Sequence, residues 1–223
     1  MSIATTDGKI KTAVITGKHP FDVPAFHTAF RSMPEIDFYA QDMEDFAADI
    51  GERRAEYDAL LFFNFHQETP GDSGSPGDEA TKTALETLGD SEQGIIILHH
   101  ALLAYPDWPL WASLVGIQVS GWRVHMDINL SIQVANPRHP ITKGLSDWVM
   151  LDETYVMGEP DANSEILLFT DDPKSMRSIA WTRRYKNARV FCFQSGHDHN
   201  AYENPNFRRV VSRGIQWAAG RLY

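Results

Sequence analysis

The ten residues FCFQSGHDHN, at positions 191–200, do most to decide the expected fold class of this 223-residue chain. An apolar run with strand character ends at Gly196 and is followed by polar residues, namely His197, Asp198 and His199. A second apolar run, residues 95–98, ends in a pair of histidines, His99 and His100. In α/β proteins, residues just beyond the carboxyl ends of parallel strands share one crevice, and ligands bind there. Both histidine groups are therefore expected at one site.

Strand-like and helix-like patterns alternate through the first hundred residues. Strands are predicted at 12–17, 36–39, 59–63 and 94–98, and helices between them at 22–33, 42–56 and 78–88. Residues 69–77 are rich in glycine and proline and predict a loop. Because such alternation produces βαβ units, we expect an α/β fold with a mostly parallel sheet and helices on both faces.

The pattern changes in the second half of the chain. Residues 127–135 alternate between apolar and polar side chains, which predicts a half-solvated antiparallel strand. Further strands are predicted at 165–169, 178–181 and 189–193, and a closing helix begins with Asn204 as N-cap and Pro205 in its first turn. We expect an extended or disordered segment over residues 1–11 and a single domain over residues 12–223.

Composition excludes several classes of partner. The net charge of −10 argues against binding to nucleic acid or to an anionic membrane, because both reward clustered lysine and arginine. No run approaches the roughly 20 apolar residues that span a bilayer, and residues 1–11 lack the apolar core of a signal peptide. The one cysteine, Cys192, excludes an internal disulfide framework. We expect a soluble, cytoplasmic protein, and the sequence leaves open whether it is a homo-oligomer.

Five motifs distributed along most of the chain resemble one known family. They are GIIILHHA at 94–101, HPITKGL at 139–145, DETY at 152–155, GHD at 196–198 and IQWAAGR at 215–221. In their order and spacing they resemble the ThuA-like (trehalose-utilisation) family, a branch of the class I glutamine-amidotransferase-like fold. The resemblance implies a flavodoxin-like sheet flanked by helices, one ThuA-like domain over residues 12–223, and a role in sugar catabolism.

The resemblance also indicates a departure from the parent fold. Amidotransferases of this fold carry a nucleophilic cysteine at a sharp turn after a strand and pair it with a histidine from a later strand. Here His99 resembles the cysteine position, and His197 resembles the partner histidine. Imidazole is a ligand or a general base far more often than a covalent nucleophile. Cys192 lies inside a strand pattern and is expected to pack as a small hydrophobe, so a thioester mechanism is disfavoured.

Three residues are the candidates for catalysis. His99 and His197 are expected to act as base and acid or as metal ligands, and Glu153 is expected to orient one of them or to act as a second proton carrier. Each also has a structural alternative, a hydrogen-bonded core histidine or a carboxylate that caps local amides. Adjacent residues of an extended strand face opposite sides, so His99 and His100 can share a crevice only at a tight turn.

Seven further residues are candidates for substrate binding because they lie at predicted strand ends or carry aromatic faces that stack on sugar rings. They are His19, His66, His100, Trp108, Tyr155, Asp198 and His199. Asp198 and His199 have an alternative role in turn hydrogen bonds, and Trp108 has one as a core anchor. Several imidazoles beside a carboxylate also suit a divalent metal such as zinc, with His99 and His197 as ligands, although no metal-binding spacing is present.

Together these features favour a small enzyme of carbohydrate metabolism that acts on a glycoside or a keto sugar. In a keto sugar the carbonyl acidifies neighbouring C–H bonds, so a histidine or glutamate base can drive elimination, hydration or isomerisation, while a metal would assist hydrolysis. Two alternatives stay open. One is a non-catalytic sugar-binding or assembly module, and the other is a metal-dependent hydrolase of a non-sugar ester or amide.

Overall fold

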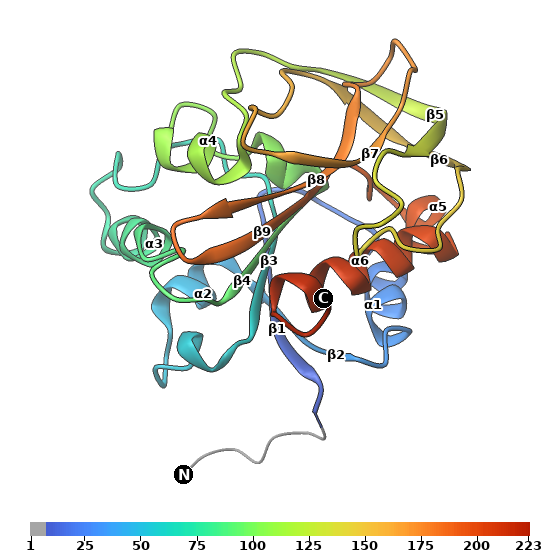
Figure 1. The fold of residues 1–223 in the computed structure, drawn as a ribbon. Helices are drawn as coiled ribbons and strands as arrows, with labels where there is room; N and C mark the ends of the chain where they lie inside the picture. Colours follow the sequence, from blue (N-terminus) through green and yellow to red (C-terminus); the bar gives the residue numbers. More distant parts are fainter. Residues whose placement is uncertain (1–7) are drawn as a thin grey trace.

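A nine-stranded mixed sheet forms the centre of the computed structural model, which describes residues 8–223 (Figure 1). The order of the strands across the sheet is β2-β1-β3-β4-β9-β8-β7-β5-β6. Their bounds are Ile10–Gly17 (β1), Ile36–Asp42 (β2), Ala59–Asn64 (β3), Gly94–Leu98 (β4), Arg123–Val134 (β5), Trp148–Val156 (β6), Glu165–Phe169 (β7), Ser178–Tyr185 (β8) and Ala188–Phe193 (β9).

Five adjacent strands, β2, β1, β3, β4 and β9, pair in parallel, as the alternating pattern predicts. All residues of β3 and β4 are buried, which explains their continuous apolar sequence in place of an alternating one. The carboxyl ends of these strands lie along one edge of the sheet, and this edge includes Asn64, Leu98 and Phe193. The histidines that follow the strands are therefore delivered to this edge.

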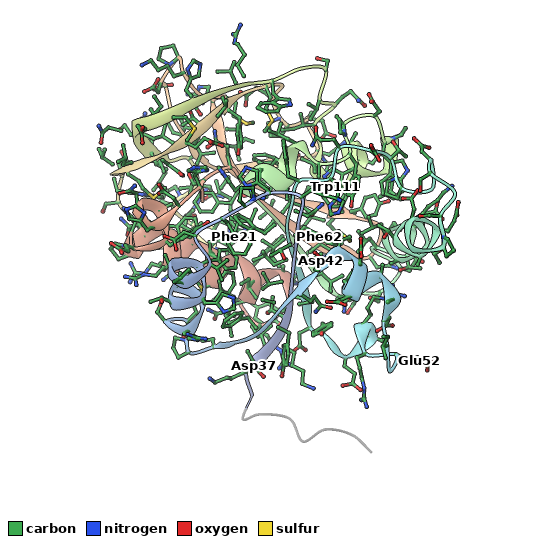
Figure 2. All side chains as sticks on the ribbon, turned by 180° about the vertical axis from the view of Figure 1, so that it is seen from behind. Phe21, Asp37, Asp42, Glu52, Phe62 and Trp111 are labelled. Atoms are coloured by element: carbon green, nitrogen blue, oxygen red, sulfur yellow. The ribbon has the colours of Figure 1, made fainter. Side chains whose placement is uncertain are left out.

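Helices cover both faces of the parallel half. Their bounds are Val23–Arg31 (α1), Met43–Ala48 (α2), Pro76–Glu86 (α3), Pro109–Val115 (α4), His199–Tyr202 (α5) and Pro205–Ala218 (α6), with 3₁₀ turns at Arg54–Glu56 (η1) and His99–Leu103 (η2). The apolar sides of α1 and α6 pack into a first hydrophobic cluster, and those of α2, α3 and α4 pack into a second on the opposite face. In the second cluster the rings of Phe62 and Trp111 meet edge to face, with their centroids 5.3 Å apart. Both residues are labelled in Figure 2.

The other four strands, β8, β7, β5 and β6, pair antiparallel and extend the sheet beyond β9. Along β5, Ile128, Leu130 and Ile132 are buried while Asn129 and Ser131 are exposed, which is the alternation that predicts a half-solvated strand. The mixed α/β fold with parallel strands first and antiparallel strands later is therefore as expected. Among the described residues, no helix combines the length and the apolar character needed to cross a bilayer.

Several predicted boundaries were wrong. The helix expected over residues 42–56 ends at Ala48, because Asp49 takes a left-handed conformation with φ of 45°; only the short turn η1 follows. The alternating strand begins at Arg123 rather than residue 127, and β6 was not predicted as a strand. Most of the segment expected to be extended or disordered, residues 1–7 of 1–11, lies outside the described residues, while Ile10 already belongs to β1.

Candidate functional site

His99 lies at a sharp turn where β4 ends. Its φ is 57°, a left-handed conformation that is uncommon for residues other than glycine, and the 3₁₀ turn η2 begins with it. This tight turn lets the neighbouring imidazoles of His99 and His100 lie on one side, with ring centroids 5.2 Å apart. The Nδ1–H of His99 donates to the carbonyl of Gln194 at 2.8 Å, so the lone pair is on Nε2. That Nε2 accepts a hydrogen bond from the hydroxyl of Tyr155 at 2.9 Å.

Glu153, on β6, places its carboxylate between two imidazoles. Its Oε1 is 3.5 Å from Nε2 of His99, and its Oε2 is 3.3 Å from Nδ1 of His197. The carboxylate is buried and His99 is fully buried, while the His197 side chain is 25% exposed. The three predicted catalytic residues therefore converge at one place, and His197 is the most exposed of them. Their roles stay predictions.

Asp152 holds this arrangement together and was not among the predicted site residues. It is buried, and its carboxylate accepts hydrogen bonds from the backbone N–H groups of Gly196 at 2.9 Å, His197 at 3.1 Å and Glu153 at 3.0 Å. The Tyr202 hydroxyl donates to the carbonyl of His197 at 3.0 Å. Gly196 has φ of 131°, and a Cβ there would lie 3.2 Å from the ring of Phe207. The turn that carries His197 is thus fixed from both sides.

Burial and the two histidines set the charges at the site. Burial alone would raise the pKa of Glu153, but the neighbouring side chains of His99, Tyr155 and His197 hold that pKa below its ordinary value. Burial raises the pKa of Asp152, against the three backbone N–H groups that favour its ionised form. Burial, reinforced by the charge of Glu153, keeps the pKa of Tyr155 well above its ordinary value. Glu153 is therefore the anion of the site, and Tyr155 is a proton donor.

His100 and His19 form a second pair of imidazoles beside the three central residues. Nε2 of the buried His100 donates to the carbonyl of Phe63 at 3.1 Å, and its ring stacks on His19 with centroids 4.2 Å apart. Burial, together with the charges of His99 and His19, lowers the pKa of His100 from 6.5 to about 2. His100 is therefore neutral at all ordinary pH values, and its Nδ1 is an acceptor.

The low pKa of His100 predicts a pH dependence of stability. Below about pH 6.5 this histidine is protonated in the unfolded chain but stays neutral in the folded protein. The free energy of unfolding therefore decreases as pH falls, by about 1.4 kcal/mol per pH unit. We expect His100→Asn to remove this part of the slope between about pH 6 and 4.5 in urea unfolding. His27→Asn, at a partly exposed helical position, serves as control. Parallel pH profiles for wild type and His100→Asn would contradict the assignment.

The structure separates the other predicted substrate-binding residues from the centre or gives them structural contacts. Asp198 caps α5 by accepting from the N–H of Asn200 at 2.9 Å, and the exposed His199 lies near Asp22. Trp108 packs edge to face on Tyr105 in the second hydrophobic cluster. The ring of His66 also stacks against the ring of Tyr105. Of the seven predicted substrate-binding residues, three lie beside the central residues: His19, His100 and Tyr155.

The three central residues could also hold a cation. One nitrogen of His99, one of His197 and one carboxylate oxygen of Glu153 lie within 4.8 Å of one another. Tetrahedral zinc with bonds of about 2.0–2.1 Å places its ligand atoms about 3.4 Å apart, whereas the separations of 3.5 Å and 3.3 Å found here join the two histidines to different oxygens of Glu153. The hydrogen bond from His99 to a backbone carbonyl is the kind of support that metal-bound histidines usually have.

The sheet order and the turn at the end of β4 define the class of protein. A glutamine amidotransferase from Thermotoga maritima has a similar fold, with a TM-score of 0.56 at 9% identity, covering 94% of this chain and 98% of that one. This protein therefore has a mixed α/β, glutamine amidotransferase-like fold.

The family follows from the sequence match. The ThuA family model, described as trehalose utilisation, matches residues 14–218, and the chain belongs to this family. A ThuA-like protein from Parabacteroides merdae is similar in structure, with a TM-score of 0.74 at 20% identity over 96% of this chain and 91% of that one. A cytoplasmic protein from Salmonella typhimurium has a TM-score of 0.65 at 12% identity over 94% and 99% of the two chains. No curated protein matches the sequence.

Proposed function

We propose that this protein is an enzyme of carbohydrate metabolism that moves protons on a glycoside or keto sugar. Family membership supports a role in trehalose utilisation and hence in carbohydrate metabolism. The observation that carries the chemistry is the carboxylate of Glu153, held between the buried imidazole of His99 and the partly exposed imidazole of His197. A base oriented by a buried carboxylate is a recurring arrangement for proton transfer.

In this proposal His197 is the group that touches the substrate. It removes the proton from the carbon next to a carbonyl, and the carboxylate of Glu153 stabilises the imidazolium that forms. His99 is fully buried, so it acts through its neighbours: its Nε2 accepts from the hydroxyl of Tyr155, and its ring lies against the carboxylate of Glu153. Tyr155 keeps its proton and, by donating it to His99, holds the orientation of that ring.

The position of the thiol supports acid–base chemistry over a thioester. Cys192 lies within β9 and is fully buried in the second hydrophobic cluster, and its Sγ is 3.8 Å from the carbonyl of Val115. Burial raises the pKa of this thiol, which keeps it protonated and unreactive. His99, at the turn after β4, lies in the position where the sequence resemblance places a nucleophile, and an imidazole serves there as a base or ligand.

A cation site is the second candidate, favoured by the three ligand atoms that lie within 4.8 Å of one another. In that case His99, Glu153 and His197 would bind the ion, and it would polarise a substrate carbonyl or activate water, as in metal-dependent hydrolysis of sugar or non-sugar substrates. A non-catalytic sugar-binding module is the third. We further propose a small-molecule carbohydrate ligand, which family membership supports, and a cytoplasmic location, which the single cysteine supports.

One experiment separates these candidates. A keto glucoside is incubated with the protein in D₂O, and the hydrogen next to the carbonyl is followed by proton NMR in protein treated with EDTA and in protein supplied with zinc. We expect exchange or product formation that EDTA leaves unchanged. Activity that appears only with zinc, with about one bound ion per chain, would establish the cation site in place of proton transfer by the imidazoles. Binding without exchange in either sample would identify the non-catalytic module.

A further inference from the structure

A cavity of about 680 Å³ lies at the sheet edge away from Glu153, and the function proposed above does not use it. Its walls come from the ends of β1 and β3, the starts of α2 and α3, and the glycine- and proline-rich loop at 69–77. We call it the switch-point cavity. Its titratable lining residues are Lys18, Glu44, His66, Glu68, Asp78 and Tyr105. Its volume lies within the usual range for small-ligand pockets, about 300–1,000 Å³.

The sheet topology independently favours a ligand at this place. The chain runs from β1 outward to β2 and then crosses back to β3, so the strand order reverses between β1 and β3. Open α/β sheets bind ligands in the crevice outside the carboxyl ends of the strands where this reversal occurs. Lys18 directly follows β1 and Phe65–Glu68 directly follow β3, so the switch-point cavity occupies that crevice.

Tyr105 is a polar group in the cavity wall that no other described residue satisfies. Its side chain is 1% exposed, and its hydroxyl has no hydrogen-bond partner among residues 8–223. The backbone is fixed, because the N–H of Tyr105 donates to the carbonyl of His66 at 2.7 Å. A buried hydroxyl without a partner costs about 1–3 kcal/mol. A ligand oxygen bound in the cavity would supply the missing partner.

The charges around the cavity favour a neutral ligand. Glu44, Glu68 and Asp78 contribute three carboxylates against the single ammonium of Lys18, and this excess of negative charge opposes phosphate or carboxylate groups. Burial, with the nearby charge of Lys18, lowers the pKa of His66, so its imidazole is neutral. The remaining polar groups in the wall are hydroxyls and an amide, which pair with the hydroxyls of an uncharged polyol.

Apolar surface in the same cavity fits one face of a sugar ring. Met43, Phe65 and Pro70 line it, and the rings of His66 and Tyr105 stack with centroids 5.7 Å apart. Sugar rings combine an apolar C–H face with a rim of hydroxyls, which matches such a mixed wall. The loop at 69–77 is already ordered, since Ser73 donates to Asp78 through both its N–H and its hydroxyl. The cavity is thus preformed.

We propose that the switch-point cavity is a second binding site, separate from Glu153, that takes a neutral, polyhydroxylated ligand of the sugar class. The lining of the cavity includes none of His99, Glu153 and His197, while Phe65, which does line it, contacts the rings of His19 and His100, so the two sites are neighbours along the sheet edge. The inference stands independently of the chemistry at Glu153, because a sugar bound here requires no turnover.

Saturation-transfer NMR and calorimetry with trehalose, glucose and glucose 6-phosphate test the proposal. We expect the two neutral sugars to bind and the phosphate to bind at least tenfold more weakly. Tyr105→Phe removes only the unpartnered hydroxyl and should weaken sugar binding about tenfold without lowering the melting temperature. Gly77→Trp places a ring in the cavity wall, at a position where a Cβ meets no heavy atom within 4 Å, and should abolish the binding of sugar in this cavity.

Matched variants keep the two sites distinguishable. Thr83→Trp adds the same ring to an exposed position of α3 that does not line the cavity, and should leave binding unchanged. Tighter binding of glucose 6-phosphate than of glucose would overturn the assignment of a neutral ligand. Sugar binding that Glu153→Gln abolishes and that Gly77→Trp leaves intact would place the ligand at the other site, and no binding of any sugar would refute the proposal.

Discussion

Replacing Glu153 with glutamine is expected to lower the rate of proton exchange or turnover by about 100-fold or more, the usual range for general acid–base groups. Glutamine keeps the shape of the side chain but removes its charge. The imidazolium that forms on His197 then has no carboxylate 3.3 Å away, and His99 loses its partner at 3.5 Å. We expect His197→Ala to cause a loss of similar size and the double variant to lose little more, since the two residues act as one unit.

The control for this experiment is Glu203→Gln, which makes the same chemical change at an exposed position after α5. It should retain full activity. Thermal unfolding of each variant shows whether a loss of rate comes from the chemistry or from the fold. Glu153→Gln with wild-type activity, or an activity loss that Glu203→Gln reproduces, would contradict the role given to Glu153.

Replacing Asp152 with alanine is expected to destabilise the protein by about 3 kcal/mol and to abolish activity. The change leaves the backbone N–H groups of Gly196 and His197 buried and unpaired, and each such group costs about 1–3 kcal/mol. For a chain of this length that corresponds to roughly 6–12 °C in melting temperature. The turn that aims His197 at Glu153 is lost with it, so activity falls even where the protein is still folded.

Asp152→Asn separates the two effects. The amide oxygen of the asparagine in this variant still accepts one of the two N–H bonds, so we expect about half the loss of stability that Asp152→Ala causes. We also expect a partial loss of activity, measured at a temperature where the Asp152→Ala and Asp152→Asn proteins are both folded. Urea unfolding and the exchange assay supply the two measurements. An Asp152→Ala protein with the melting temperature and activity of wild type would show that the carboxylate does not hold the turn.

Local sequence signals predicted the parallel half of the fold well because the short apolar runs there are fully buried strands separated by helical patterns. They failed at two places for different reasons. The helix predicted to run to residue 56 ends at Ala48, because Asp49 is left-handed and its carboxylate accepts from the N–H groups of Arg53 and Arg54. β6 was missed because its residues near the site, Asp152 and Glu153, are polar although buried, and their partners come from strands distant in the sequence.

For the candidate site too, some residues could be predicted from the local sequence and others could not. Strand-end position was enough to predict that His99 and His197 lie together, because carboxyl ends of parallel strands share an edge. The importance of Asp152 was not visible, since a carboxylate that accepts backbone N–H bonds looks in sequence like any other aspartate. Its position directly before Glu153 in the DETY motif was the one available signal. Asp198 and His199 were predicted from their position at a strand end, with turn hydrogen bonds as the alternative; Asp198 caps α5, and the role of both in substrate binding stays a prediction.

The central claim is that His197, supported by the carboxylate of Glu153 and by buried His99, removes a proton from a sugar substrate, and exchange in D₂O tests it most directly. The wild-type protein, freed of metal with EDTA, is mixed with a keto glucoside, and the proton NMR signal of the hydrogen next to the carbonyl is followed over time. Our account predicts that this signal disappears far faster than in buffer, and that it persists when Glu153→Gln replaces wild type. A signal that decays equally in buffer, wild type and Glu153→Gln would contradict the account.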